Sequence, residues 1–241
     1  MWIFPLGAAA VSAYFAGLVL SGYRHRKRPN MLAWSAALIM FSVASAATAV
    51  GMLFGWAPTT FRVYYLFGAI LNVPVLALGT VYLLAPRRAS DICAAVVVVA
   101  SLFATVVLID AGIDSTGLDT NGIPRGSEVL SGTVRLLSRY YSIAGFLVVV
   151  GGALWSSMRM ARTRQPHLRR LAGANLLIAA GTTVVAVASE VARLATGSAA
   201  GSVFAVGLLL GVSLMFVGFL RTRARLPAPA SASPRSEGAD T

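Results

Sequence analysis

Seven long apolar runs divide the chain, and short polar segments separate them. A helix that rises 1.5 Å per residue needs about 20 apolar residues to cross the hydrocarbon core of a bilayer. Each run is expected to be helical, because lipid cannot satisfy unpaired backbone groups. The pattern therefore predicts an all-α polytopic bundle of seven transmembrane helices, covering roughly residues 2–23, 31–55, 61–85, 91–111, 136–158, 171–194 and 200–220.

Two segments lack this apolar character. Residues 112–135 are rich in Gly with scattered Asp, which indicates a loop outside the membrane. Residues 226–241 are rich in Pro, Ala and Ser, a composition typical of disordered chain. We therefore expect one transmembrane domain over residues 1–225 and a disordered cytoplasmic tail over residues 226–241.

The basic residues predict the direction in which the helices cross the membrane. Most of the 20 lie in the first, third and fifth connections and in the tail, whereas the acidic residues concentrate on the other side. Basic segments stay in the cytoplasm during insertion, so the N-terminus is expected outside and the C-terminus in the cytoplasm. The residues on the predicted inner side are Arg24, Arg26, Lys27, Arg28, Arg87, Arg88, Arg159, Arg162, Arg164, Arg169, Arg170, Arg221, Arg223, Arg225 and Arg235.

Composition supports a membrane location. Apolar residues make up 57% of the chain and charged residues 12%, about half the charged share of an average soluble domain. The net charge of +12 does not indicate nucleic-acid binding, because the charges flank apolar runs, where anionic lipids attract them. Lys27 is the only lysine, a bias that we attribute to a GC-rich bacterial genome. We expect a multi-pass protein of the bacterial inner membrane, with the bilayer as its partner and anionic lipids at its basic cytoplasmic loops.

Several chemistries lack the residues they need. His25 and His167 both fall in predicted cytoplasmic loops, so neither a transmembrane haem nor a serine–histidine protease is indicated. Lys27 also lies in a loop, which leaves no lysine for a retinal Schiff base. Asp91 and Asp110 lie at opposite ends of the fourth span, too far apart to act as a pair. We therefore expect no catalytic residue, no metal, no cofactor and no enzymatic activity.

Polar and small residues recur at steps of three and four in the third, fifth and sixth runs, which places them on one face of each helix. Such a face is typical of a helix that borders protein or water instead of lipid. The faces are Arg62, Tyr65, Ala69, Asn72, Leu76 and Gly79; Arg135, Arg139 and Ser142; and Asn175, Ala179, Thr182, Ala186, Glu190 and Arg193. From them the sequence predicts a ligand-binding site formed by Arg62, Tyr65, Asn72, Arg139, Glu190 and Arg193.

The charged members of this site lie near the predicted outer boundary of the membrane. Glu190 follows Arg170 by 20 residues, or about 30 Å of helix. At that depth a charge reaches water at little cost. One interpretation is the rim of an outward-facing pocket. The alternative is an interfacial ion pair between Glu190 and Arg193 with no ligand.

Asn72 lies deeper, near the middle of the membrane. Pro74 follows it and cannot donate a hydrogen bond to the carbonyl of Ile70, so a hinge is predicted at this proline. An amide beside free carbonyls suits a polar solute. The alternative is that Asn72 only hydrogen-bonds a neighbouring helix.

Two further patterns concern assembly. Leu32-Ala33 and Leu38-Ile39 match Leu171-Ala172 and Leu177-Ile178 at one constant offset, as in a parallel repeat of three helices with the fourth helix as connector. Gly207 and Gly211 form a close-packing motif that serves contacts within the bundle or between two copies. A homo-oligomer or a protein partner is therefore left open.

Three functions agree with these patterns. The first is a permease or facilitator for a small uncharged solute, which would move along the polar faces of the third, fifth and sixth spans. The second is a non-catalytic accessory or assembly subunit, and the third is a sensor with an outward-facing ligand site. A water-accessible cavity that reaches Asn72 would favour transport, a solid core the subunit, and a shallow external cleft the sensor.

Overall fold

The computed structural model describes residues 2–118, 123–162, 166–194 and 198–223, without the side chains of 26, 166–171, 192–194, 198–200 and 222–223. Over these ranges the chain is helical without strands, and seven helices are long and apolar enough to cross a membrane. The predicted all-α seven-helix fold is thereby confirmed. Six spans are single helices: α1 (Ile3–Arg26), α2 (Pro29–Phe54), α5 (Arg87–Asp110), α7 (Gly132–Ala161), α8 (Pro166–Leu194) and α9 (Ser198–Arg223).

The third span is composite. It consists of α3 (Pro58–Tyr64), the π-helical segment η1 (Tyr65–Leu71) and α4 (Asn72–Leu84). Prolines begin this span and α2, at the first turn, where their missing N–H would have no helical partner. Gly55 has φ of +88°, a conformation that other residues rarely adopt, and it ends α2.

Three helices begin four or five residues before their predicted starts: α5 at Arg87, α8 at Pro166, and α7. This helix begins at Gly132, whereas the apolar run begins after Arg135, so part of the segment predicted as loop is helical. The difference arises because hydropathy marks only the part of a helix inside hydrocarbon, and the helix itself continues beyond it. The tail predicted over residues 226–241 lies outside the described residues.

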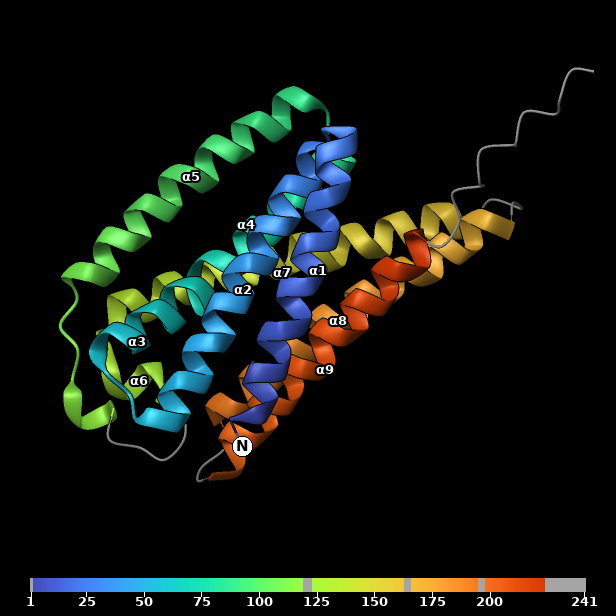
Figure 1. The fold of residues 1–241 in the computed structure, drawn as a ribbon. Coiled ribbons are helices and arrows are strands. Elements are labelled where there is room, and N and C mark those ends of the chain that lie inside the picture. The colour runs from blue at the N-terminus through green and yellow to red at the C-terminus, as the bar shows by residue number, and fades with distance from the viewer. Residues whose placement is uncertain (1, 119–122, 163–165, 195–197, 224–241) are drawn as a thin grey trace, which may run out of the picture.

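Six of the seven spans form a closed ring. α1 packs against α2, α2 against the third span, α4 against α7, α7 against α8, α8 against α9, and α9 returns to α1. α5 lies outside this ring, against η1, α4 and α7, and it stands apart from the other helices in Figure 1. The first three spans pack as one group and the last three as another. The two groups meet along two seams, where α4 packs against α7 and α9 packs against α1. Two parallel three-helix units with a connector helix would produce this order, but so would helices that simply pack in the order of the chain, so the repeat stays a prediction.

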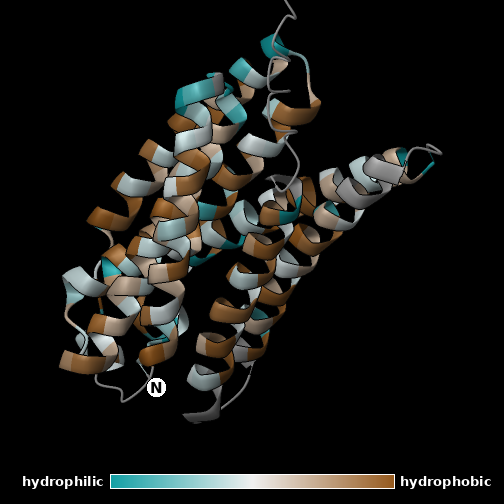
Figure 2. Ribbon diagram, turned by 45° about the vertical axis from the view of Figure 1, so that its right-hand side comes forward, coloured by the Kyte–Doolittle hydropathy of each residue, from teal (hydrophilic) through white to brown (hydrophobic). Residues whose placement is uncertain are grey.

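α5 presents an apolar face to its surroundings. The aliphatic residues Ile92 and Val99 are each 66% exposed. Exposing such a face to water is unfavourable by about 25 cal/mol per Å², a penalty that disappears in hydrocarbon. Figure 2 shows apolar residues along all the long helices, with strongly hydrophilic residues gathered near several helix ends.

An apolar core joins α1, α2 and α9. Phe15 packs in one cluster with Leu38, Val212 and Met215, and all four side chains are buried. The hydroxyl of Ser12 donates to the Leu38 carbonyl at 2.8 Å, which ties α1 to α2 inside the same region. Such interhelical hydrogen bonds contribute about 0.6 kcal/mol each in a membrane. This cluster fills the bundle between the three helices.

α8 and α9 approach closely because both present small residues at their contact. A Cβ atom added at Gly181 would lie 2.5 Å from the carbonyl oxygen of Gly211, and one at Gly207 would overlap Ala188. Residues with larger side chains would therefore force the helices apart. The close-packing motif of Gly207 and Gly211 thus serves a contact within the bundle.

The connection between α5 and α7 folds back onto the third span. It contains a 3-10 turn, η2 (Ser115–Leu118), and the short helix α6 (Gly126–Val129). Leu118, Val129 and Leu130 are buried in one cluster with the aromatic residues of α3 and η1. The segment that composition predicted as a loop is therefore packed over the third span.

Candidate functional site

A cavity of about 1830 Å³ lies inside the ring of helices. It extends from the end of the bundle where α1, α7 and α9 begin, called here the N-terminal end, to residues in the middle of the spans. Gly132 and Gly201 line it at that end, and Leu76, Thr182 and Val212 line it at mid-span. Ligand pockets usually measure roughly 300–1,000 Å³, so this space accommodates a small solute together with water. Its walls come from α2, the third span, the connection before α7, and helices α7, α8 and α9.

The third span changes its backbone hydrogen bonding where it borders the cavity. Residues Tyr65–Leu71 are π-helical, and Pro74 follows in α4. Pro74 has no N–H, so residue 74 can bond neither to the Ile70 carbonyl in α-helical register nor to the Ala69 carbonyl in π-helical register. The predicted hinge thus lies directly after a π-helical segment, a feature that is frequent at functional sites.

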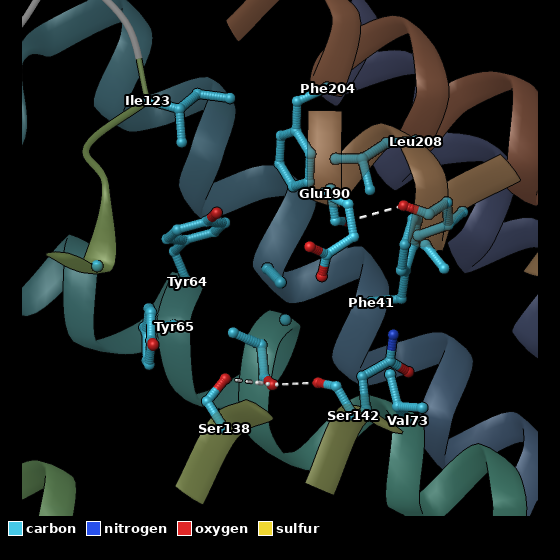
Figure 3. Close-up of a pocket in the computed structure, with 18 of the residues that line it drawn as sticks. Phe41, Tyr64, Tyr65, Val73, Ile123, Ser138, Ser142, Glu190, Phe204 and Leu208 are labelled. Carbon is cyan, nitrogen blue, oxygen red and sulfur yellow. Dashed lines mark hydrogen bonds between the residues drawn. The ribbon is translucent and has the colours of Figure 1, made fainter. Parts of the chain in front are cut away.

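Two serines of α7 supply hydrogen bonds at this point. The hydroxyls of Ser138 and Ser142 both donate to the carbonyl oxygen of Ala69, at 3.0 Å and 3.1 Å, as Figure 3 shows. Each serine lines the cavity. Since a hydroxyl oxygen that donates its hydrogen keeps its lone pairs, both oxygens can still accept hydrogen bonds from a solute.

A glycine allows α7 to come this close to α4. A Cβ atom added at Gly145 would lie 2.8 Å from Cγ1 of Val73 and 2.9 Å from its carbonyl carbon and oxygen. Real carbon atoms pack at about 3.5–4.0 Å, so only glycine fits without displacing the backbone of α4. The close contact brings the serines of α7 within hydrogen-bonding distance of Ala69.

Asn72 faces the same cavity at mid-membrane depth. It lies near the middle of the span Pro58–Leu84, is half-buried, and lines the cavity. The hydrogen bonds between described side chains and the protein do not include its amide, in contrast to Asn175, which donates to Ser156 at 3.1 Å. The alternative in which Asn72 hydrogen-bonds a neighbouring helix is therefore not seen within the described residues. Its amide is left as both a donor and an acceptor toward the cavity.

Charged side chains gather at the N-terminal end of the cavity. Arg125, Glu128, Arg135, Arg139 and Glu190 all line it. Arg125 and Glu128 form an ion pair, with 3.5 Å between Nη1 and Oε1. Figure 3 shows Glu190 extending from α8 toward the space beside Tyr64. Neither Arg135 nor Arg139 forms an ion pair with a described carboxylate.

The structure brings four of the six predicted ligand-binding residues to this cavity: Tyr65, Asn72, Arg139 and Glu190. Tyr65 is buried, and its ring stacks on Phe61 with 5.6 Å between centroids. The side chain of Arg193 lies outside the described residues.

Arg62 is not among the residues that line the cavity. Its Nη2 atom donates to the carbonyl oxygens of Ala111 at 3.0 Å and Ile109 at 3.3 Å, at the end of α5. Carbonyls at a helix C-terminus lack helical partners and attract cations, so this contact fixes α5 to α3.

The sequence patterns missed several residues of the cavity. Ser138 lies one turn before Ser142 on the same helix face, a spacing that could have identified it. The wall formed by Ile123, Pro124 and the following residues carries no periodic signal, because it belongs to an irregular connection. The pattern of hydropathy likewise does not predict that η1 is π-helical.

The described residues contain no group of three or more His, Cys, Asp or Glu side chains that could hold a metal ion. The polar groups of the cavity are amides, hydroxyls, phenols, guanidinium groups and the carboxylates of Glu128 and Glu190, which bind solutes through hydrogen bonds and charge. A comparison of the chain with protein-family models, with curated proteins and with solved structures finds no match, so the geometry of the cavity carries the functional argument.

Proposed function

We propose that the protein is a permease or facilitator for a small polar solute. The observation that supports this proposal is a cavity of about 1830 Å³ that reaches Asn72 at the middle of the third span. An accessory subunit would need only a packed core, and a sensor only a shallow external cleft. A polar path halfway through the membrane serves neither function as directly as it serves passage of a solute.

The solute would bind where the third span meets α7. Asn72 offers an amide with both donors and an acceptor, and the hydroxyl oxygens of Ser138 and Ser142 offer acceptors. A polar solute that leaves water loses its hydrogen bonds, at a cost of roughly 1–3 kcal/mol for each unsatisfied group. Replacement partners at mid-membrane lower this barrier.

Beyond the binding groups, apolar residues close the path. Leu38, Val212 and Met215 belong both to the cavity wall and to the buried cluster with Phe15. Passage therefore requires the two three-helix units to move relative to each other along their seams. Rigid-body motion of two repeated units around a central site is how repeat-based transporters alternate access.

Uptake into proteoliposomes tests the proposal, with Asn72→Leu and Asn175→Leu as a matched pair. The probes are lactamide and lactate, supplied outside vesicles that contain the purified protein or none. We expect at least one probe to enter faster with protein, and Asn72→Leu to slow that entry roughly tenfold, since one lost hydrogen bond is worth about 1.4 kcal/mol at the barrier.

Asn175→Leu removes an amide of the same type that hydrogen-bonds Ser156 and does not line the cavity. It should leave the uptake rate per folded protein unchanged. Equal rates in vesicles with and without protein would contradict the proposal. So would binding of a probe without its entry, the behaviour expected of a sensor.

A further inference from the structure

Two arginines of α7 face the cavity without a carboxylate partner. Arg135 and Arg139 are one helical turn apart, so their side chains project from the same face. Both are exposed, and both line the cavity near its N-terminal end. Neither forms an ion pair with a described side chain, whereas Arg125 at the same end pairs with Glu128.

The backbone of α7 adds to the positive potential at this point. Arg135 and Arg139 lie in the first two turns of the helix, close to the positive end of its dipole. The first turn contains no acidic residue, and Ser131 does not cap the helix with its side chain. Gly132, the first residue of α7, also lines the cavity. A cation is destabilising at a helix N-terminus, and two like charges one turn apart repel each other. A bound anion would reduce both of these unfavourable interactions.

We propose that Arg135 and Arg139 bind the carboxylate or phosphate group of a small organic anion that enters the cavity. This inference rests on the proposed transport function and names the class of its solute. Sequence patterns alone favoured an uncharged solute. The unpaired arginines argue instead for a solute with one anionic end and one hydrogen-bonding end.

The geometry of the cavity suits such a molecule. Guanidinium groups bind carboxylate and phosphate oxygens through two parallel hydrogen bonds, which gives orientation as well as attraction. Ser142 lies one turn beyond Arg139 on the same helix, so the polar end of the solute would point toward Ala69 and Asn72. Three arginines (Arg125, Arg135 and Arg139) and two glutamates (Glu128 and Glu190) line this end, and the net positive charge raises the local concentration of anions.

Binding of lactate and of its neutral amide, lactamide, tests this inference separately from transport. Saturation-transfer NMR measures both dissociation constants on the full chain in phosphatidylcholine nanodiscs. We expect lactate to bind more tightly than lactamide. The double variant Arg135→Gln with Arg139→Gln should weaken the binding of lactate at least tenfold, or by about 1.4 kcal/mol, without changing the binding of lactamide.

Arg159→Gln with Arg162→Gln is the matched control, because it removes the same charge from the other end of α7, outside the cavity. This control should bind both probes like the unchanged protein. Arg135→Lys with Arg139→Lys keeps the charge but not the paired hydrogen bonds, and should retain part of the preference for lactate. Equal binding of lactate by the Gln variant and the unchanged protein would overturn the inference.

Lipid phosphate is the other source of the same chemistry. A second set of nanodiscs therefore contains phosphatidylglycerol, with a spin label on the lipid. If the arginines bind a solute, the label should contact the protein equally in the Gln variant and the unchanged protein. Loss of the label contact in the Gln variant, together with unchanged lactate binding, would assign the arginines to a lipid headgroup and overturn the inference. If lactate bound no more tightly than lactamide while lactamide still entered the vesicles, the inference about the arginines would fail and the proposed transport function would remain supported.

Discussion

Replacing Gly145 with alanine should separate α7 from α4 and disturb the site directly. The new Cβ would lie 2.8 Å from Cγ1 of Val73 and 2.9 Å from its backbone carbonyl. Apolar contacts settle at about 3.5–4.0 Å, so the helices must part by about 0.7 Å. The hydrogen bonds from Ser138 and Ser142 to Ala69, now 3.0 Å and 3.1 Å, would lengthen beyond the limit for a hydrogen bond.

The expected loss of stability follows from three terms. Overpacking against a backbone carbonyl is unfavourable by about 1–3 kcal/mol. Loss of both serine donors leaves the Ala69 carbonyl unsatisfied, which costs about 1–3 kcal/mol. The higher helix propensity of alanine returns at most about 1 kcal/mol. The free energy of unfolding should therefore fall by about 3 kcal/mol.

Gly151→Ala provides the control on the same helix. A Cβ at Gly151 meets no atom within 4 Å, so only the gain in helix propensity remains. The assay is reversible unfolding in mixed micelles, followed by circular dichroism as the denaturing detergent is increased. Equal stability of the two alanine variants would refute the idea that glycine at position 145 sets the distance between α4 and α7.

Two further predictions concern the same region and the end of α5. Ser138→Ala and Ser142→Ala should each lower the unfolding free energy by less than about 1 kcal/mol, because the Ala69 carbonyl keeps one donor. The double variant should lose more stability than the two single variants together, since it leaves the Ala69 carbonyl unsatisfied at a cost of about 1–3 kcal/mol. Strictly additive losses in the same unfolding assay would show that cavity water replaces the serines. Arg62→Leu should speed hydrogen exchange in the last turn of α5, where Arg62 now contacts two carbonyls, and unchanged exchange there would mean that the contact does not hold α5.

Part of the cavity could be predicted from spacing along single helices. Tyr65 and Asn72 share a face of the third span, and both line the cavity. Arg139 and Glu190 follow from the same reasoning on α7 and α8. Periodicity succeeds here because a helix that borders a polar space must place its polar residues on one side.

Arg62 shows where that reasoning stops. It belongs to the same periodic face as Tyr65, yet its guanidinium contacts the end of α5. A long side chain near a helix end chooses among several neighbours, and the choice depends on which helix lies beside it. The hydrogen bond from Ser138 to Ala69 likewise depends on the π-helical register and on the close approach at Gly145. Local composition reveals neither of these features.

By itself the sequence determined that seven helices cross a membrane, and its arginines predicted which way they run. These properties depend on the transfer free energy of consecutive residues, which is a local sum. Only the tertiary structure decided that α5 stands outside a ring of six helices and that the ring encloses a cavity. A cavity exists where side chains from helices far apart in the sequence fail to fill the space between them, so no stretch of sequence contains it.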